Sequence, residues 1–289
     1  MSSSQFSMLK LLKATQNFSP DMIIGHGDSF LLYKAHLSNG LTVAVKKLDP
    51  TEFPGFWEFR AEAETLGKLR HPNIIKLLGY SSDGHFVYEY IERGDLQCLL
   101  HDSDNPLPWS TRLGIVRGLA NGLAYLHGLK SPIVHRDIRA KNVLLDLEFQ
   151  PHITSFGLAR QIESSHVSTI DDGAMGYMPP EYLAGNNVAT LRGDVFSFGI
   201  LMLEIATAKW PNLPIMFDHK EKMRIVEWAR KMVMGDRQIE MMESCIRMQD
   251  LDEDIVKKYF SIACLCSREI ARERPPMIEV VELLNELSM

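Results

Sequence analysis

The feature that most constrains this fold is a change in hydrophobic periodicity near Gly94. Before it, residues 40–48 and 85–91 are short runs of β-branched and aromatic residues, which are typical of β-strands. Residues 55–70 lie between these runs and have the composition and period of a helix. After Gly94 the apolar residues recur at i, i+3 and i+4 over longer segments, which predicts amphipathic helices. Those segments are residues 109–129, 194–208 and 252–267.

We therefore expect an α+β fold with a β-rich first lobe and a larger α-helical second lobe, which meet near residues 89–92. The proline-containing segment 209–220 is expected to be a surface loop between two helices. With 289 residues, of which 45% are hydrophobic, the chain can bury a substantial core.

Net charge and apolar run length bear on the class of partner. The formal net charge of −6 argues against nucleic acid, for which a basic surface would be expected. The apolar run 195–208 is shorter than the roughly 20 residues that cross a bilayer, and it contains Glu204. It is expected to be a buried core helix, so any link to a membrane should come from sequence outside this chain.

The cysteines are expected to be reduced, because their spacing matches no disulfide framework. They are Cys98, Cys245, Cys264 and Cys266. Cys264 and Cys266 could be interpreted as metal ligands, but no second pair lies nearby. Buried structural thiols in an apolar helix are the preferred interpretation.

Short motifs along the chain form an ordered series, although each is a weak signal alone. They are Gly-His-Gly at 25–27, VAVK ending at Lys46, HRDIRAKN at 135–142, Ser-Phe-Gly at 155–157 and Pro-Pro-Glu at 179–181. In this order and at these intervals the series resembles the eukaryotic protein kinases. The resemblance runs from about residue 18 to the end of the chain.

Three longer segments narrow the resemblance to plant receptor-like kinases, especially those with leucine-rich-repeat ectodomains. They are residues 6–25, 166–185 and 192–211. The resemblance implies the bilobal protein-kinase fold, with a juxtamembrane-like segment at 1–19, an N-lobe at 20–90 and a C-lobe at 91–289. It also implies a place on the cytoplasmic side of the plasma membrane, as part of a single-pass receptor.

Most residues for phosphoryl transfer are retained. The resemblance implies that Lys46 contacts the α- and β-phosphates of ATP and pairs with a helix carboxylate. By position in the segment FRAEAETLG we expect Glu62 rather than Glu64 in that pair. Residues two positions apart on a helix point about 200° apart, so only one of the two can face the lysine. It further implies that Asp137 orients the substrate hydroxyl. Two more roles follow from it: Arg139 neutralises the transferring phosphate and Asn142 holds a magnesium ion.

Position 155 departs from the family pattern. The family has an Asp before Phe-Gly that binds magnesium, and this chain has Ser155. A neutral hydroxyl is a poor substitute for that carboxylate, because magnesium favours hard, anionic oxygen ligands. As an alternative, Asp171 or Asp172 of the activation segment could supply the missing ligand. Ser155 and Asn142 remain the candidate metal positions, and magnesium binding is expected to be impaired.

The phosphate loop is also altered. Gly25 and Gly27 are present, but Phe30 replaces the third glycine and Asp28 adds negative charge. A backbone that approaches phosphates closely favours positions without a Cβ, so we expect weakened ATP binding. The resemblance implies that the adenine pocket consists of Leu32, Ala44, Leu144, the gatekeeper Tyr88 and the hinge from Glu89 to Ile91.

Other positions are expected to be structural or regulatory. Leu66, Leu77, His135 and Phe156 match a hydrophobic spine that joins the lobes. Asp194 is expected to be a helix N-cap that also ties down the catalytic loop, and Glu181 is expected to pair with Arg274. In the activation segment Ala174 replaces a Thr. Arg136 is the type of residue that receives a phosphate there, on Ser164, Ser165, Ser168 or Thr169; the equal alternative is that these residues form a polar, solvated loop.

These features favour a pseudokinase domain that signals through contacts with an active receptor kinase or another signalling protein. Residual ATP binding or phosphorylation could gate those contacts. A Ser/Thr kinase with unusual metal handling is the alternative. A small-molecule phosphotransferase is disfavoured by the Pro-Pro-Glu segment and the helical tail.

Overall fold

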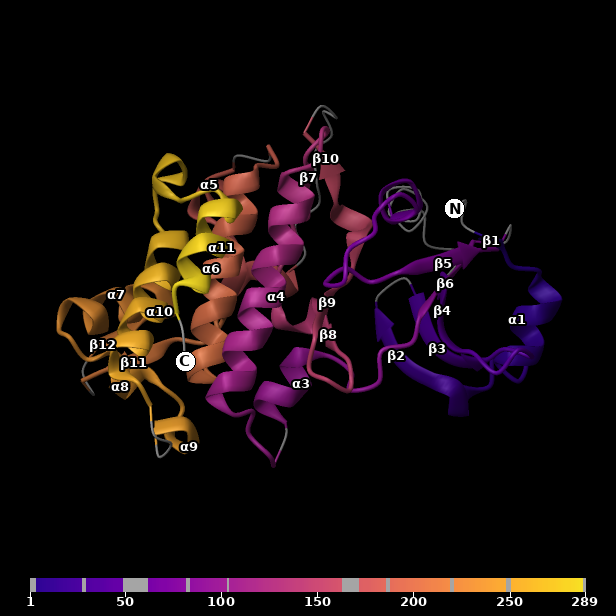
Figure 1. Cartoon of the computed structure of the whole chain (residues 1–289), viewed down its shortest axis with the longest axis horizontal. Helices are drawn as coiled ribbons and strands as arrows, with labels where there is room; N and C mark the ends of the chain where they lie inside the picture. The colour runs from indigo at the N-terminus through magenta and orange to yellow at the C-terminus, as the bar shows by residue number, and fades with distance from the viewer. Residues whose placement is uncertain are drawn as a thin grey trace.

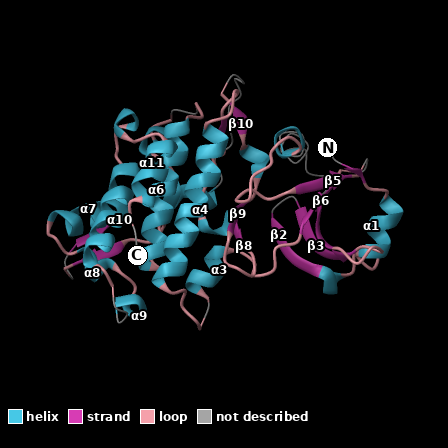
Figure 2. Cartoon of the chain, viewed as in Figure 1, coloured by secondary structure: helices cyan, strands magenta, loops and turns pink. Residues whose placement is uncertain are grey.

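The computed structural model places a β-sheet lobe and a helical lobe end to end (Figure 1). It describes residues 4–27, 30–48, 62–81, 84–102, 104–162, 172–185, 188–218, 221–247 and 251–287. Figure 2 shows the separation directly, with most strands at one end and most helices at the other. The predicted α+β architecture, with a β-rich first lobe and an α-helical second lobe, is confirmed.

Among the described residues, the N-lobe holds a six-stranded sheet in the order β1-β5-β6-β4-β3-β2. Its strands are β1 (Ser4–Gln5), β2 (Ile23–Gly27), β3 (Phe30–His36), β4 (Thr42–Leu48), β5 (Leu77–Tyr80) and β6 (His85–Glu89). Strands β2 to β6 pair antiparallel, whereas the edge strand β1 pairs parallel with β5. The β-branched and aromatic runs predicted as strands correspond to β4 and β6.

The sheet is covered on one face by the N-terminal helix α1 (Met8–Ala14). Leu11 of this helix is fully buried against Tyr33, Val43 and Val45, which alternate along β3 and β4 and so share a face. The opposite face carries Leu32, Ala44 and Lys46 toward the C-lobe. The segment before residue 20 therefore packs on the sheet, and its juxtamembrane role stays a prediction.

A short linker after β6 leads into the C-lobe. Gly94 has a φ of +78°, and Asp95 caps the next helix by accepting a hydrogen bond from the backbone N–H of Cys98 at 2.9 Å. The helices that follow are α3 (Leu96–His101), α4 (Trp109–His127), α5 (Pro180–Leu183), α6 (Leu191–Thr207), α7 (Ile225–Met234), α8 (Gln238–Met241), α9 (Ser244–Arg247), α10 (Glu253–Cys266) and α11 (Met277–Asn285). The three predicted C-lobe helices match α4, α6 and α10.

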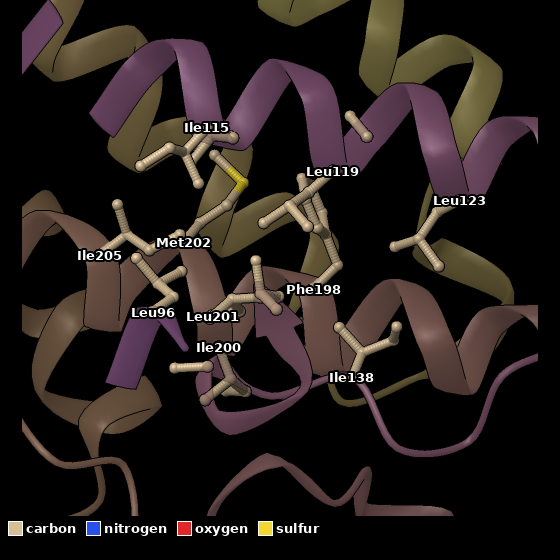
Figure 3. Packing of buried hydrophobic residues seen from close by; sticks show 14 of the residues in the cluster. Leu96, Ile115, Leu119, Leu123, Ile138, Phe198, Ile200, Leu201, Met202 and Ile205 are labelled. Atoms are coloured by element: carbon tan, nitrogen blue, oxygen red, sulfur yellow. The ribbon is translucent and has the colours of Figure 1, made fainter. Parts of the chain in front are cut away.

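The C-lobe core lies between α4 and α6, which run side by side (Figure 3). Leu96 from α3 and Ile138 from the catalytic loop join it, so the loop is anchored in the larger of the two apolar clusters that the described residues form. The same cluster continues into the N-lobe through Leu66, Leu77 and Phe86. The main residues shown are Ile115, Leu119, Leu123, Phe198, Ile200, Leu201, Met202 and Ile205.

The expectation of a loop at 209–220 is wrong in part. Within it, β11 (Ile215–Phe217) pairs antiparallel with β12 (Glu221–Met223) to make a small hairpin. Prolines at 211 and 214 precede the strand, so they do not remove any N–H from its ladder. In the described part of the chain, no helix is both long and apolar enough to cross a lipid bilayer.

Candidate active site

The catalytic loop is held between short strands at the junction of the lobes. It begins after β7 (Ile133–Val134), which pairs with β10 (Arg160–Gln161). It ends in a 3-10 turn, η2 (Ala140–Asn142), which leads into β8 (Val143–Leu145), and β8 pairs with β9 (Pro151–Ile153). Both ends of residues 135–142 are thereby fixed by backbone hydrogen bonds.

Asp137 lies at the centre of a polar network on this loop. Its side chain is nearly buried, with 8% exposure. Arg139 Nε lies 3.0 Å from Asp137 Oδ1, and the amide of Asn142 donates to Asp137 Oδ2 at 2.6 Å and to its carbonyl oxygen at 2.9 Å. The structure thus brings together the three residues assigned to the hydroxyl, the phosphate and the metal, while their roles stay predictions.

Asp194 ties this loop to the C-lobe, as expected. Its carboxylate accepts hydrogen bonds from the backbone N–H groups of His135 at 2.7 Å and Arg136 at 2.8 Å, and it lies 3.0 Å from His127 Nε2. The expected N-cap role is wrong, because α6 begins three residues earlier and Thr190 accepts from the N–H of Gly193 at 3.0 Å. The Asp194 carboxylate is therefore directed at the loop. Its hydrogen bond with the N–H of Arg136 stabilises that residue in a backbone conformation with a φ of +74°.

Lys46 and Glu62 form an ion pair in the N-lobe half of the site. Lys46 Nζ lies 2.7 Å from Glu62 Oε2, and the two side chains are 13% and 3% exposed. Glu62, rather than Glu64, is thus the partner in the structure. The Tyr88 hydroxyl is buried beside them, and burial together with the nearby Glu62 carboxylate raises its pKa.

The residues assigned to the adenine lie on the cleft side of the sheet and on β8. Leu32 is the cross-strand partner of Lys46, and Ala44 is the partner of Tyr88, so these side chains share the face opposite α1. Leu144 packs against the same cluster, and its strand bonds to the linker at residues 93 and 94. Ile91 also packs there, and Glu89 ends β6. The apolar lining fits the faces of a heteroaromatic base.

Phe30 lies where the phosphate loop meets this face. Its ring presses on Gly27: a Cβ built on Gly27 would lie 2.3 Å from Phe30 Cε1. The ring also lies under the ammonium of Lys46, 4.5 Å from Nζ to the ring centroid. The sequence had shown only that a glycine is lost, and no sequence signal gave the ring's direction. The phosphate side of the site therefore fits a triphosphate poorly.

Ser155 adopts a left-handed backbone conformation, with φ of 64° and ψ of 59°, just before the turn η3 (Phe156–Leu158). Its hydroxyl donates to Asn142 Oδ1 at 3.0 Å. Since the Asn142 amide also donates to Asp137, both ends of that amide are engaged within the protein. The candidate metal positions thus supply one amide oxygen and one hydroxyl, joined to each other, which do not fit the carboxylate-based site that magnesium prefers.

The alternative metal ligands proposed from the sequence are Asp171 and Asp172. Asp171 lies outside the described residues, and nothing is described of the side chain of Asp172, so this alternative stays open. No group of three or more His, Cys, Asp or Glu side chains able to hold a metal occurs in the described ranges. Cys266 is buried, and burial raises the pKa of its thiol; burial raises the pKa of Cys264 to about 11. Both cysteines fit the structural interpretation.

A family model described as protein tyrosine and serine/threonine kinase matches residues 20–284 of this chain. The chain belongs to the protein kinase family. This kinase domain is 42% identical over 287 residues to leucine-rich repeat receptor protein kinase EMS1 of Arabidopsis thaliana, covering 96% of the chain and 24% of that protein. It is 40% identical over 286 residues to phytosulfokine receptor 1 of Arabidopsis thaliana, covering 96% and 28%. To brassinosteroid LRR receptor kinase BRL3 of Oryza sativa subsp. japonica it is 38% identical over 289 residues, covering 96% and 23%.

These relatives confirm the resemblance of the kinase domain to plant leucine-rich-repeat receptor kinases. The chain spans about a quarter of their length. The kinase family uses ATP and magnesium in general. The departures at Ser155 and Phe30 are properties of this chain that the family match does not explain.

The four residues assigned to the hydrophobic spine lie in the interior of the kinase domain. Leu66, Leu77, His135 and Phe156 are all buried, and the rings of His135 and Phe156 meet edge to face at 4.7 Å. His135 Nε2 lies 2.8 Å from the carbonyl oxygen of Thr154, which can only accept, so Nε2 carries the hydrogen. His135 Nδ1 then accepts from the N–H of Asp137 at 3.2 Å. Burial lowers the pKa of His135, consistent with this neutral form.

The activation segment of the kinase domain is described only in part. Ser164, Ser165, Ser168 and Thr169 lie outside the described residues, and Ala174 belongs to the turn η4 (Asp172–Tyr177), of whose first side chains nothing is described. Arg136 is partly buried, and burial lowers its pKa. Its role as a phosphate receiver stays a prediction.

Proposed function

We propose that this chain is a receptor-like pseudokinase domain that acts in signal transduction through protein contacts, with phosphoryl transfer absent or very weak. The observation that carries the proposal is Ser155. It occupies the metal-binding position of the family, and its hydroxyl is directed at Asn142 rather than held free for a cation. A domain that keeps its spine and catalytic loop but lacks the metal carboxylate is suited to conformational signalling.

The missing carboxylate charge at position 155 sets the size of the expected loss of turnover. Magnesium neutralises charge on the β- and γ-phosphates. The ion favours anionic oxygen ligands in near-octahedral geometry. Loss of a residue that hydrogen-bonds to a metal ligand commonly lowers metal affinity or activity by about 10–100-fold. Loss of a residue that binds the metal directly should lower them further. We expect turnover at least about a thousandfold below that of an active relative, or about 4 kcal/mol in activation free energy. Magnesium binding should be impaired to match.

A weakened affinity for ATP belongs to the same proposal. Gly25 and Gly27 are kept, but the Phe30 ring lies against Gly27 and against the ammonium of Lys46. The apolar residues Leu32, Ala44 and Leu144 would still hold the base.

A second candidate is an active Ser/Thr kinase with atypical metal handling. The specific observation in its favour is the Lys46–Glu62 ion pair at 2.7 Å, together with the Asp137, Arg139 and Asn142 network. With these residues in place, phosphoryl transfer would need only a substitute metal ligand.

Transfer from radiolabelled ATP separates the two candidates. We expect wild-type protein, with magnesium or manganese, to incorporate no more label than Asp137→Asn. Ser155→Asp and Ser155→Asn form a matched pair, since both side chains tolerate the left-handed conformation and differ in charge. Only Ser155→Asp should gain transfer. Wild-type transfer that Asp137→Asn abolishes would establish the active kinase instead.

The relatives' names as receptor kinases support a proposal for the partner and the location of the full protein. We propose that the full protein is a single-pass receptor with this domain on the cytoplasmic side of the plasma membrane, in contact with an active receptor kinase or another signalling protein. Protease protection of membrane vesicles carrying the full-length protein tests this. Protection of the kinase domain in right-side-out vesicles is expected, and its digestion would contradict the location.

A further inference from the structure

Phe30 belongs to the cleft face of the sheet because of its register. It precedes Leu32 by two residues on β3, and side chains alternate between faces with a period of two. Leu32 is paired with Lys46, so Phe30, Leu32 and Lys46 point to the same side. Phe30 is also the cross-strand partner of Gly27. The fold therefore directs this ring into the phosphate side of the site.

The ring occupies space that glycine keeps free. In a phosphate loop the absence of a Cβ lets the backbone approach an anion closely. Here the position of a Cβ on Gly27 would lie 2.3, 2.8 and 2.9 Å from three carbons of the Phe30 ring. The vacant volume beside Gly27 is thus filled by the chain's own side chain.

The same ring covers the cation that would receive phosphates. Lys46 Nζ lies 4.5 Å from the ring centroid and 2.7 Å from Glu62 Oε2, and its side chain is 13% exposed. Arg139, the other cation assigned to phosphate, lies 3.0 Å from Asp137. A triphosphate would have to displace this ring from Gly27 and from Lys46 before its phosphates could approach either residue.

The base side of the site is different. Along the β3–β4 ladder, Leu32 lies two positions from Phe30 and Ala44 lies four positions from it. At the rise of a strand, both are therefore about 7 Å or more from Phe30. Together with Leu144 they offer apolar contacts to a planar ring and place no charge against it.

We infer that this cleft selects an uncharged purine nucleoside over the corresponding triphosphate, without a divalent cation, and that Phe30 sets this preference. The inference depends on the proposed function only in placing the ligand in the kinase cleft. It concerns binding, so it stands or fails separately from phosphoryl transfer.

Titration calorimetry with adenosine, AMP, ADP and ATP tests the inference, in EDTA and again with magnesium. Wild-type protein should bind adenosine at least as tightly as ATP in both buffers. Phe30→Gly should bind ATP about tenfold or more tighter than wild type, with adenosine affinity changed less than about threefold. Phe30→Ala should give the same direction of change and serves if the glycine variant unfolds.

Leu31→Gly is the matched control. It is the next residue on the same strand, its side chain is 39% exposed, and it lies on the other face. It carries the same backbone cost of glycine and should keep the wild-type order of affinities. The inference is overturned if wild type binds ATP about tenfold tighter than adenosine, or fails to bind adenosine at millimolar concentration. It is also overturned if neither Phe30 variant gains ATP affinity. Label transfer by wild type would defeat the proposed function and leave these affinities as a separate result.

Discussion

Replacing Glu181 with Ala should strongly destabilise the helical lobe, because Glu181 is the partner of a buried guanidinium. The side chain of Arg274 has 0% exposure and that of Glu181 has 20%. Two parallel hydrogen bonds of 2.6 and 2.7 Å join them. The other N–H groups of Arg274 donate to the carbonyl oxygens of Arg192, Arg268 and Glu269, so all of its donors are used.

The magnitude follows from this arrangement. Glu181→Ala leaves a buried positive charge and two N–H donors without acceptors. Removing one partner of a buried ion pair typically lowers the free energy of unfolding by about 3–5 kcal/mol, and we expect a loss in this range. Glu181→Gln keeps one acceptor oxygen and nearly the same volume but lacks the charge. Its loss should be about 1.5–3 kcal/mol.

Urea unfolding measures these losses. Tryptophan fluorescence and far-UV circular dichroism should report the same midpoint, which justifies a two-state free energy. Glu240→Ala is the control, because its ion pair with Arg237 is exposed, with side chains 53% and 37% accessible. That variant should keep the wild-type midpoint. A loss for Glu181→Ala below about 1 kcal/mol, or no larger than that of the control, would refute the reasoning.

Three further predictions use the same unfolding assay. Asp194→Ala should lower the free energy of unfolding by about 3–5 kcal/mol, because the N–H groups of His135 and Arg136 lose their buried acceptor, and a loss below about 1 kcal/mol would contradict this. Burial lowers the folded-state pKa of His135 below its ordinary value of 6.5. The stability that neutral His135 contributes is therefore fully present above pH 6.5. Stability should then fall as the pH falls from about 7.5 to 5.5, since the unfolded state takes up a proton that the folded state excludes; an equal slope in His135→Tyr would show another group to be responsible. Leu11→Ala should cost about 2–4 kcal/mol, whereas Leu9→Ala on the same helix, at a side chain 64% exposed, should have little effect. Equal effects of the two leucine variants would mean that this helix is not part of the folded N-lobe.

Local pattern and motif order were enough to predict the two lobes, strands β4 and β6, helices α4, α6 and α10, and the cluster of residues at the lobe junction. The choice of Glu62 over Glu64 also came from the sequence: its position in the segment FRAEAETLG selected Glu62, and helical geometry allowed only one of the two to face the lysine. The Glu181–Arg274 pair was likewise expected and is present. Asp194 shows where the prediction failed: a helix start could be recognised, but its first residue could not, so the carboxylate was assigned to the helix as well as to the loop.

By itself, the sequence determined that the chain has the kinase motif series and that its metal-binding position has a hydroxyl in place of a carboxylate. Both are statements about residue type and order, which folding does not change. The tertiary structure alone decided that the ring of Phe30 lies against Gly27 and Lys46, and that the Ser155 hydroxyl bonds to Asn142. The direction of a side chain depends on strand register and on neighbours far away in sequence, and these exist only once the chain has folded.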